Sequence, residues 1–119
     1  MCLSNQKAEC YQLSPVKDIS SFALSLCIAE NGSGPVDGQA KISSNFGDLE
    51  LPLIGNIKPA GSGYEVDLKL KSPKPPVQSV TIQVITDESF NAQLASYTIT
   101  LTNGKSYTLN NAPANNCLQ

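Results

Sequence analysis

Apolar side chains alternate with polar ones along much of this chain. Residues 64–71 show the pattern most clearly, because every second side chain is apolar and the others are charged. The apolar positions are Tyr64, Val66, Leu68 and Leu70, and the charged positions are Glu65, Asp67, Lys69 and Lys71. A period of two predicts a β-strand with one buried face. A solvated second face is typical of antiparallel sheets.

Similar short runs recur through the sequence. They lie at residues 22–29, 39–44, 49–53, 80–84, 97–101 and 107–109, and a further strand is expected near the N-terminus around Cys10. Residues 22–29 also fit a helical spacing, but their unbroken alternation favours a strand. Seven or eight short strands separated by turn residues predict an all-β, antiparallel sandwich or small barrel. We expect one domain over residues 1–119, with loosely ordered ends at 1–8 and 111–119 apart from their cysteines.

The last two runs can be aligned with each other through the turn between them. A two-residue turn at Asn103-Gly104 would place apolar residues opposite hydroxyls on both faces of the hairpin. A three-residue loop at 102–104 instead gathers the apolar side chains on one face, as a core requires. In that register Ile99 pairs with Tyr107 and Tyr97 pairs with Leu109. We therefore predict a type I turn followed by Gly104 in a left-handed bulge.

The segment from Leu51 to Ile54 combines apolar residues with a proline. Pro52 cannot donate a ladder hydrogen bond, so we expect its strand to lie at a sheet edge or to carry a bulge. If Leu51 and Leu53 face the core, Ile54 points outward beside Pro52. Exposed apolar edges recruit other strands or protein partners. The candidate interface therefore consists of Leu51, Pro52, Leu53 and Ile54.

The composition limits the chemistry that the chain can carry. Its 119 residues include no His and no Trp, and Arg is also absent. His is the usual general base near neutral pH and a common metal ligand, so we expect no enzymatic activity, no metal and no cofactor. Eight lysines against ten acidic residues leave no basic surface for nucleic acid. We also expect no membrane insertion, because no apolar run approaches the roughly 20 residues of a spanning helix.

Four cysteines stand at widely spaced positions, namely Cys2, Cys10, Cys27 and Cys117. An even number in a small, weakly charged domain favours two disulfides and an oxidising compartment. We favour the pairs Cys10–Cys27 and Cys2–Cys117, and Cys2–Cys10 with Cys27–Cys117 is the nearest alternative. In a different interpretation, Cys2 follows a start residue as the first residue of a mature bacterial lipoprotein and carries a lipid anchor.

Other polar residues form weaker candidate sites. Asn31 begins an N-glycosylation sequon, Asn-Gly-Ser, in a polar turn, so it is a candidate glycosylation position. Asp48 with Glu50, and Asp87 with Glu88, are carboxylates at expected loop edges. Neither pair lies in a recognisable enzyme or calcium motif. The many serines have no histidine to activate them as nucleophiles.

Short motifs resemble those of known β-sandwich proteins. Ser25-Leu26-Cys27 resembles the second strand of immunoglobulin-like modules, and Gly63-Tyr64-Glu65-Val66 resembles a strand opening of such folds. The core Trp and the Tyr-x-Cys strand of true immunoglobulin domains are missing. About half of the chain is similar to the lumenal domain of the translocon-associated protein delta subunit, through Cys10, Leu26-Cys27, Tyr64-Glu65-Val66 and Asp87-Glu88-Ser89-Phe90. These resemblances imply an immunoglobulin-like antiparallel β-sandwich of seven or eight strands.

Together these features predict a non-enzymatic β-domain of an extracellular, periplasmic or lumenal compartment. Its expected role is protein–protein interaction or surface assembly, with a protein partner or with further copies of itself. The alternative is a small-ligand or carbohydrate-binding module that uses tyrosine side chains. Those tyrosines are Tyr11, Tyr64, Tyr97 and Tyr107. The alternation directs at least three of them to the core, which favours the interaction role.

Overall fold

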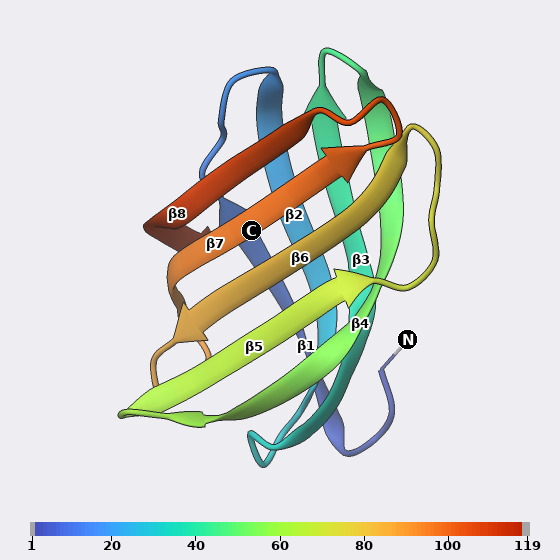
Figure 1. Ribbon diagram of the computed structural model, residues 1–119. Helices are drawn as coiled ribbons and strands as arrows, with labels where there is room; N and C mark the ends of the chain where they lie inside the picture. The colour runs from blue at the N-terminus through green and yellow to red at the C-terminus, as the bar shows by residue number, and fades with distance from the viewer. Residues whose placement is uncertain (1, 118–119) are drawn as a thin grey trace.

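The computed structural model describes residues 2–117, and these residues form eight β-strands joined by turns and short loops (Figure 1). The strands are β1 (Gln6–Leu13), β2 (Ile19–Ala29), β3 (Gly34–Ser44), β4 (Gly47–Ala60), β5 (Gly63–Leu70), β6 (Val77–Thr86), β7 (Ala92–Leu101) and β8 (Ser106–Asn116). Each predicted run overlaps one of them, so the all-β prediction is confirmed. Most strands extend beyond the predicted runs, because backbone pairing continues where the apolar alternation stops.

The strands close into a barrel. Each strand pairs antiparallel with the next one in the sequence, and β8 returns to pair with β1. Figure 1 shows the barrel with β1–β4 behind β5–β8. An immunoglobulin-like sandwich has two separate sheets linked by Greek-key connections, so that part of the prediction is wrong. Alternation fixes which face of a strand is buried, and a sandwich and a barrel both bury one face.

The seam between β1 and β8 is the shortest ladder of the barrel. Its pairs are Tyr11–Asn116, Gln12–Asn115 and Leu13–Ala114. The Cys10–Cys117 disulfide and a 2.9 Å hydrogen bond from Cys117 N to Cys10 O continue the seam. The prediction of loosely ordered ends is therefore wrong for residues 6–8 and 111–116, where pairing orders segments with few apolar side chains. Its outermost part, at residues 1 and 118–119, lies outside the described residues.

The four cysteines form two disulfides, as predicted, but with a different pairing. Cys2 is bonded to Cys27, and Cys10 is bonded to Cys117. Both the favoured pairing and its nearest alternative are therefore wrong. Because the sulfur of Cys2 is bonded to Cys27, a lipid anchor on that sulfur would require this disulfide to be absent.

The register of β1 against β2 explains why the favoured pairing fails. Ala8 lies opposite Cys27, and Cys10 lies opposite Ser25. Cys10 and Cys27 are therefore diagonal neighbours on the outer face rather than a directly facing pair. Each of them is bonded instead to a cysteine near one end of the chain. This register depends on which turns join the strands, and cysteine spacing alone does not contain it.

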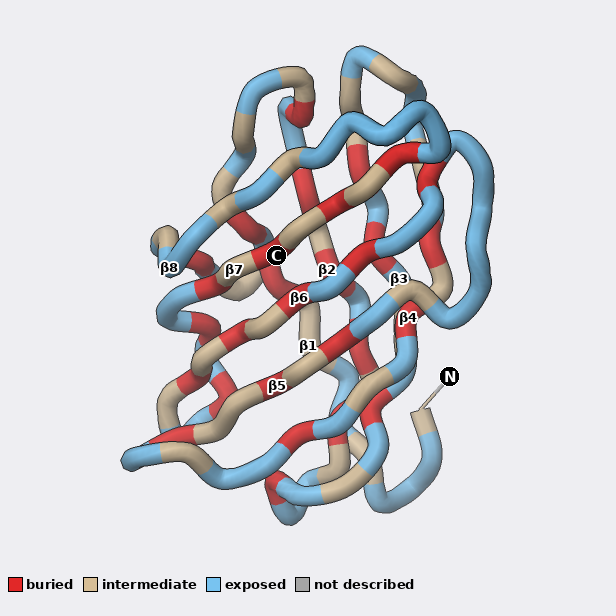
Figure 2. The backbone as a smooth tube through the Cα atoms, in the orientation of Figure 1, coloured by how far each residue is buried: buried red, intermediate tan, exposed pale blue. Residues whose placement is uncertain are grey.

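Side chains fill the interior of the barrel, and Figure 2 shows buried residues alternating with more exposed ones along the strands. The aromatic pairs Phe46–Tyr107, Phe22–Tyr97 and Tyr64–Phe90 have ring centroids 5.4, 4.4 and 4.6 Å apart. The first pair lies near the β3–β4 turn, and the last lies by the β6–β7 loop at the other end. An eight-stranded barrel is just wide enough for side chains to fill. The interior is therefore a packed core.

The β7–β8 hairpin has the predicted register. Ile99 pairs with Tyr107, and Tyr97 pairs with Leu109. Gly104 N donates to Leu101 O at 2.9 Å, and Leu101 N donates to Lys105 O at 2.8 Å. Gly104 has a φ of 91°, which a residue with a Cβ atom rarely adopts. The three-residue loop with a left-handed glycine is therefore confirmed.

Pro52 does not mark an edge strand, contrary to the prediction. Strand β4 pairs with β3 over residues 47–57 and with β5 from Leu53 onward. The carbonyl of Pro52 accepts a hydrogen bond from Lys71 N at 2.9 Å, just beyond the β4–β5 ladder. The nitrogen and the carbonyl of one strand residue point to the same side. The missing donor of Pro52 therefore falls where that ladder ends.

Removing the Cys10–Cys117 bond should destabilise the barrel more than removing the Cys2–Cys27 bond. The two bonds join residues separated by 107 and 25 positions. The chain-entropy model then gives losses of about 4.8 and about 3.5 kcal/mol. Urea unfolding of the double variants C10A/C117A and C2A/C27A, beside the wild type, measures both losses. A larger loss for C2A/C27A would show that the β1–β8 seam does not depend on its disulfide.

Stability should also fall in alkaline solution. Tyr97 donates its hydroxyl to Ser14 O at 2.9 Å, and burial raises the pKa of Tyr97 to about 12. Burial raises the pKa of Tyr11 as well, with the charges of Glu9 and Asp87 adding to the effect. The folded state thus holds these phenolic protons more tightly than the unfolded chain, whose tyrosine pKa is about 10. The stabilisation is complete below about pH 10 and is lost as the pH rises toward 12.

Urea unfolding at several pH values, with phenolate absorbance as a second signal, tests this dependence. The variant Tyr97→Phe should lose about 1 kcal/mol at neutral pH, because the bond to Ser14 is gone. Its stability should then fall less steeply than that of the wild type above about pH 10. An unchanged alkaline slope in Tyr97→Phe would contradict the assignment.

Candidate functional site

An open groove with a volume of ≈ 930 Å³ lies over the outer face of β1–β4. Its floor includes one row that crosses the four strands: Cys10, Ser25, Gln39 and Pro52 lie opposite one another in turn. Their chain neighbours Tyr11, Leu24, Ala40 and Leu51 are buried in the core. Because successive side chains of a strand point to opposite faces, the row faces outward. We call this surface the disulfide groove.

Both disulfides line the disulfide groove, together with Asn116 at the end of β8. At its other side lies Lys74, in the connection between β5 and β6. The Lys74 ammonium donates to Glu50 O at 2.6 Å. The groove is thus framed by both ends of the described chain and by one loop. Covalent bonds hold that frame in place, so the groove exists before any partner binds.

The structure divides the candidate interface predicted from sequence. Leu51 and Leu53 are 0% and 1% exposed and belong to the core. Pro52 lies in the disulfide groove, and Ile54 is 39% exposed on the same outer face of β4. The row that contains Ile54 continues through Asp37 to Cys27. Half of the predicted residues therefore lie at the surface, where Ile54 is one of the few large apolar side chains exposed.

Sequence reasoning missed most of the disulfide groove. The outward positions of Ser25 and Gln39 follow from the same alternation that predicted their strands. Their position in one row depends on the registers of three consecutive ladders. No local motif carries that information, and the sequence signals for the groove were Pro52 and the four cysteines.

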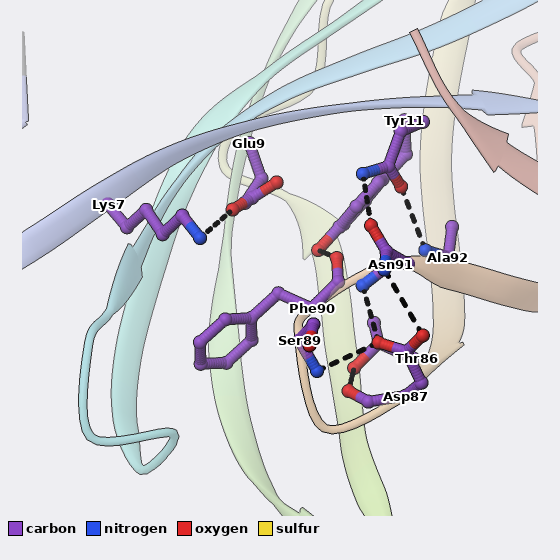
Figure 3. A network of polar contacts seen from close by, with 10 residues as sticks. Lys7, Glu9, Tyr11, Thr86, Asp87, Ser89, Phe90, Asn91 and Ala92 are labelled. Carbon is purple, nitrogen blue, oxygen red and sulfur yellow. Dashed lines mark hydrogen bonds and ion pairs between the residues drawn. The ribbon is translucent and has the colours of Figure 1, made fainter.

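A second polar cluster closes the barrel end at the β6–β7 loop (Figure 3). The Asp87 carboxylate accepts hydrogen bonds from Ser89 N at 2.8 Å and Asn91 N at 2.9 Å. These bonds, with the Asn91 side chain, hold the pKa of Asp87 below its ordinary value. Phe90 has a φ of 65°, and its carbonyl accepts the buried Tyr11 hydroxyl at 2.7 Å. The β6–β7 loop therefore covers this end of the barrel, and the hydrogen bonds of Asp87 fix the conformation of the loop.

Charged side chains of β1 complete this end of the barrel. The Lys7 ammonium lies 3.3 Å from a Glu9 carboxylate oxygen and 5.5 Å from the centre of the Phe90 ring. The side chain of Glu9 is only 10% exposed. Figure 3 shows Lys7, Glu9 and Phe90 gathered beside the loop. Lys7 thus forms an ion pair with Glu9 and a cation–π contact with Phe90, and both contacts suit a structural role.

The carboxylates predicted at loop edges do not form one site. Glu50 forms an ion pair with Lys41 at 3.7 Å, while Asp87 shapes the β6–β7 loop. The structure instead brings together Glu65 and Asp67 on the outer face of β5. Burial and the neighbouring Glu65 raise the pKa of Asp67, and hydrogen bonding to Asp67 with the nearby Lys58 lowers the pKa of Glu65. The alternation placed both residues outward, but their interaction was not predicted.

Asn31 lies exposed in the turn between β2 and β3. Its side-chain carbonyl accepts a hydrogen bond from Ser33 N at 3.0 Å, which is an Asx turn. The turn is accessible, and glycosylation of Asn31 stays a prediction.

Comparisons of this chain with models of known protein families, with curated proteins and with solved structures find no match. The resemblances to immunoglobulin-like modules and to the translocon-associated protein delta subunit stay predictions. Within residues 2–117, no helix has the length and apolar character to cross a bilayer. The same residues hold no group of three or more His, Cys, Asp or Glu side chains placed to bind a metal ion.

The role of Asp87 can be tested by titration. The backbone amide signals of Ser89 and Asn91 should shift as the Asp87 carboxylate gains its proton, with a midpoint below the ordinary aspartate range. Because the folded pKa is lowered, the loop should stay ordered above that range and loosen as the pH falls through the midpoint. NMR spectra recorded over acidic pH values measure this. Asp87→Asn should abolish the shift, whereas Glu88→Gln should preserve it.

Proposed function

We propose that this barrel is a non-enzymatic protein-interaction module of an extracellular, periplasmic or lumenal compartment. It binds a protein partner, or further copies of itself, through the disulfide groove. The observation that carries the proposal is the preformed groove across β1–β4. Its floor is a row of small and medium-sized side chains that includes Ser25 and Pro52. Side chains fill the interior, so recognition is assigned to the outer surface.

The character of the groove favours a protein over a small polar ligand. Pro52 and the disulfide sulfurs offer apolar surface, and Gln39, Glu50 and Lys74 offer hydrogen bonds and charge around it. Protein interfaces combine an apolar centre with a polar rim in this way. The exposed Ile54 extends the apolar surface along β4. A partner that covers both features would bury them together.

The alternative, a carbohydrate or small-ligand module, would need aromatic side chains at the surface. Tyr11 and Tyr97 are buried, while Tyr64 and Tyr107 are half-buried and stack on phenylalanines. None of the four lines the disulfide groove. This arrangement favours the interaction role over the alternative.

The redox state of the cysteines supports the proposed compartment. All four cysteines are in disulfides, and both bonds line an open surface where a reductant can reach them. Disulfides persist in secreted, periplasmic and lumenal proteins and are kept reduced in most cytosols. The Cys10–Cys117 bond also supports the barrel seam. An oxidising environment is therefore the one in which this fold is best stabilised.

A pair of matched variants tests the proposed function. Ser25 and Thr81 are exposed hydroxyl residues on outer strand faces, within and outside the disulfide groove respectively. Ser25→Arg should weaken partner binding or self-association at least about tenfold by filling the groove, and Thr81→Arg should leave both unchanged. Quantitative co-purification from the native source and light scattering at several protein concentrations measure the two effects. Equal behaviour of both variants, or a monomer that retains no partner, would refute the proposal.

A further inference from the structure

The first half of β8 lacks a strand on one side. Residues 106–109 and 112–113 pair with β7, but β8 meets β1 only at residues 114–116. Between these parts the strand bends at Asn111, which has a φ of 44°. Asn111 N donates to the Ser96 hydroxyl at 3.0 Å, and that hydroxyl lies 3.2 Å from the Asn111 side-chain oxygen. The bulge directs the end of β8 to the seam and leaves its beginning as a free edge.

The hydrogen-bond pattern of the hairpin shows which backbone groups lie at this edge. Leu101 N donates to Lys105 O, so pairs at odd positions, such as Ile99 with Tyr107, are the hydrogen-bonded ones. The N–H and C=O groups of Ser106, Thr108 and Asn110 therefore point away from β7. No described strand lies beside them. They form a regular series of donors and acceptors at every second residue.

A gap of ≈ 490 Å³ lies beside this edge. One wall is Lys105–Thr108, and the other is Val16–Asp18 in the loop between β1 and β2. Figure 1 shows that loop next to β8 at the same end of the barrel. Val16, Tyr107 and Leu109 pack against the core but are only partly buried. The core is thus incompletely covered where the backbone is unpaired.

An extended polypeptide matches this edge. Its own N–H and C=O groups recur at every second residue and can complete the ladder about 4.8 Å from β8. Alternate side chains of such a segment would cover Tyr107 and Leu109, and the others would face solvent. The loop at Val16–Asp18 forms the opposite wall of the gap, so the added strand would lie between that loop and β8.

The charges around the gap select an acidic segment. Lys17 and Lys105 are exposed on its two walls. Asp18, the carboxylate among the described residues that line the gap, accepts hydrogen bonds from Asn45 Nδ2 at 2.9 Å and from the Tyr107 hydroxyl at 3.4 Å. The charge of the Asp18 carboxylate is therefore partly compensated by hydrogen bonds within the protein. Acidic residues beside the added strand would meet the two free ammonium groups.

We propose that β8 accepts an extended acidic segment of another protein as an additional strand, between residues 106–110 and the β1–β2 loop. This surface is separate from the disulfide groove and does not depend on it. Binding by strand addition places its affinity in backbone hydrogen bonds and its specificity in alternate side chains and in the two lysines.

Amide exchange of the wild-type protein gives the first test. In the free protein the amides of Ser106, Thr108 and Asn110 should exchange quickly, while those of Tyr107 and Leu109 are protected by β7. The probe is a short synthetic peptide in which Val and Thr alternate and Glu stands at both ends. Adding it should slow exchange at the three edge amides. The same peptide with alternate backbone nitrogens methylated should have no effect.

Variants test the location and the charge preference. Thr108→Pro removes an edge N–H without touching the β7 ladder and should weaken peptide binding at least about tenfold. Thr108→Ala keeps that N–H and should bind as the wild type does. A second peptide has the same alternating Val and Thr but carries Lys instead of Glu at both ends. The double variant K17E/K105E reverses both charges of the gap, so it should bind this Lys-ended peptide more tightly than the Glu-ended one. Thermal unfolding of each variant checks that it is folded.

Three results would overturn the proposal. The first is an absence of edge-amide protection at the highest soluble peptide concentration. The second is equal binding by Thr108→Pro and Thr108→Ala. The third is edge-amide protection in the free protein that rises with protein concentration, which would identify the occupant as a second copy of this chain. Ser25→Arg separates the two surfaces, because it should abolish binding in the disulfide groove and leave peptide binding at β8 intact.

Discussion

The closure of β8 on β1 is the contact on which the rest of the structure depends. Seven of the eight ladders join strands that follow each other in the sequence, so each forms locally around a turn. The eighth joins the two ends of the chain through three residue pairs and the Cys10–Cys117 bond. Without it the sheet would have two open edges, and buried residues such as Tyr11 and Leu13 would lose their cover. A small ladder with a high loop-closure cost is where a covalent bond contributes most.

The shortness of this seam also creates the surfaces available for recognition. A barrel normally removes the free edges that make sheets adhesive. Here β8 reaches β1 only after its bulge at Asn111, so residues 106–110 remain an edge. At the other side of the seam, Cys10 and Cys117 line the disulfide groove. Both candidate surfaces therefore flank the place where the chain ends meet, and the interior contributes only rigidity.

The features predicted correctly from the sequence depend on residues that are close together in the chain, and the features predicted wrongly depend on distant ones. The strand at 64–71 and the register of Ile99 against Tyr107 depend on alternation and on one turn, and both were correct apart from the strand's last residue. The disulfide pairing and the choice between sandwich and barrel depend on contacts between distant segments, and both were wrong. Residues 111–116 look unstructured by composition, but backbone bonds to β1 and β7 order them. The groove row of Cys10, Ser25, Gln39 and Pro52 needs three registers at once, which no local pattern specifies.

The position of the second disulfide explains how a barrel can keep a free edge and remain one structure. A strand added beside Thr108 would compete with β1 for β8 if the seam could open, because both lie on the same side of that strand. The Cys10–Cys117 bond fixes the end of β8 to β1 beyond the bulge. The reciprocal contacts of Asn111 with Ser96 hold the bend between the two halves. Strand addition is therefore confined to residues 106–110, and it can extend the sheet without unzipping the barrel.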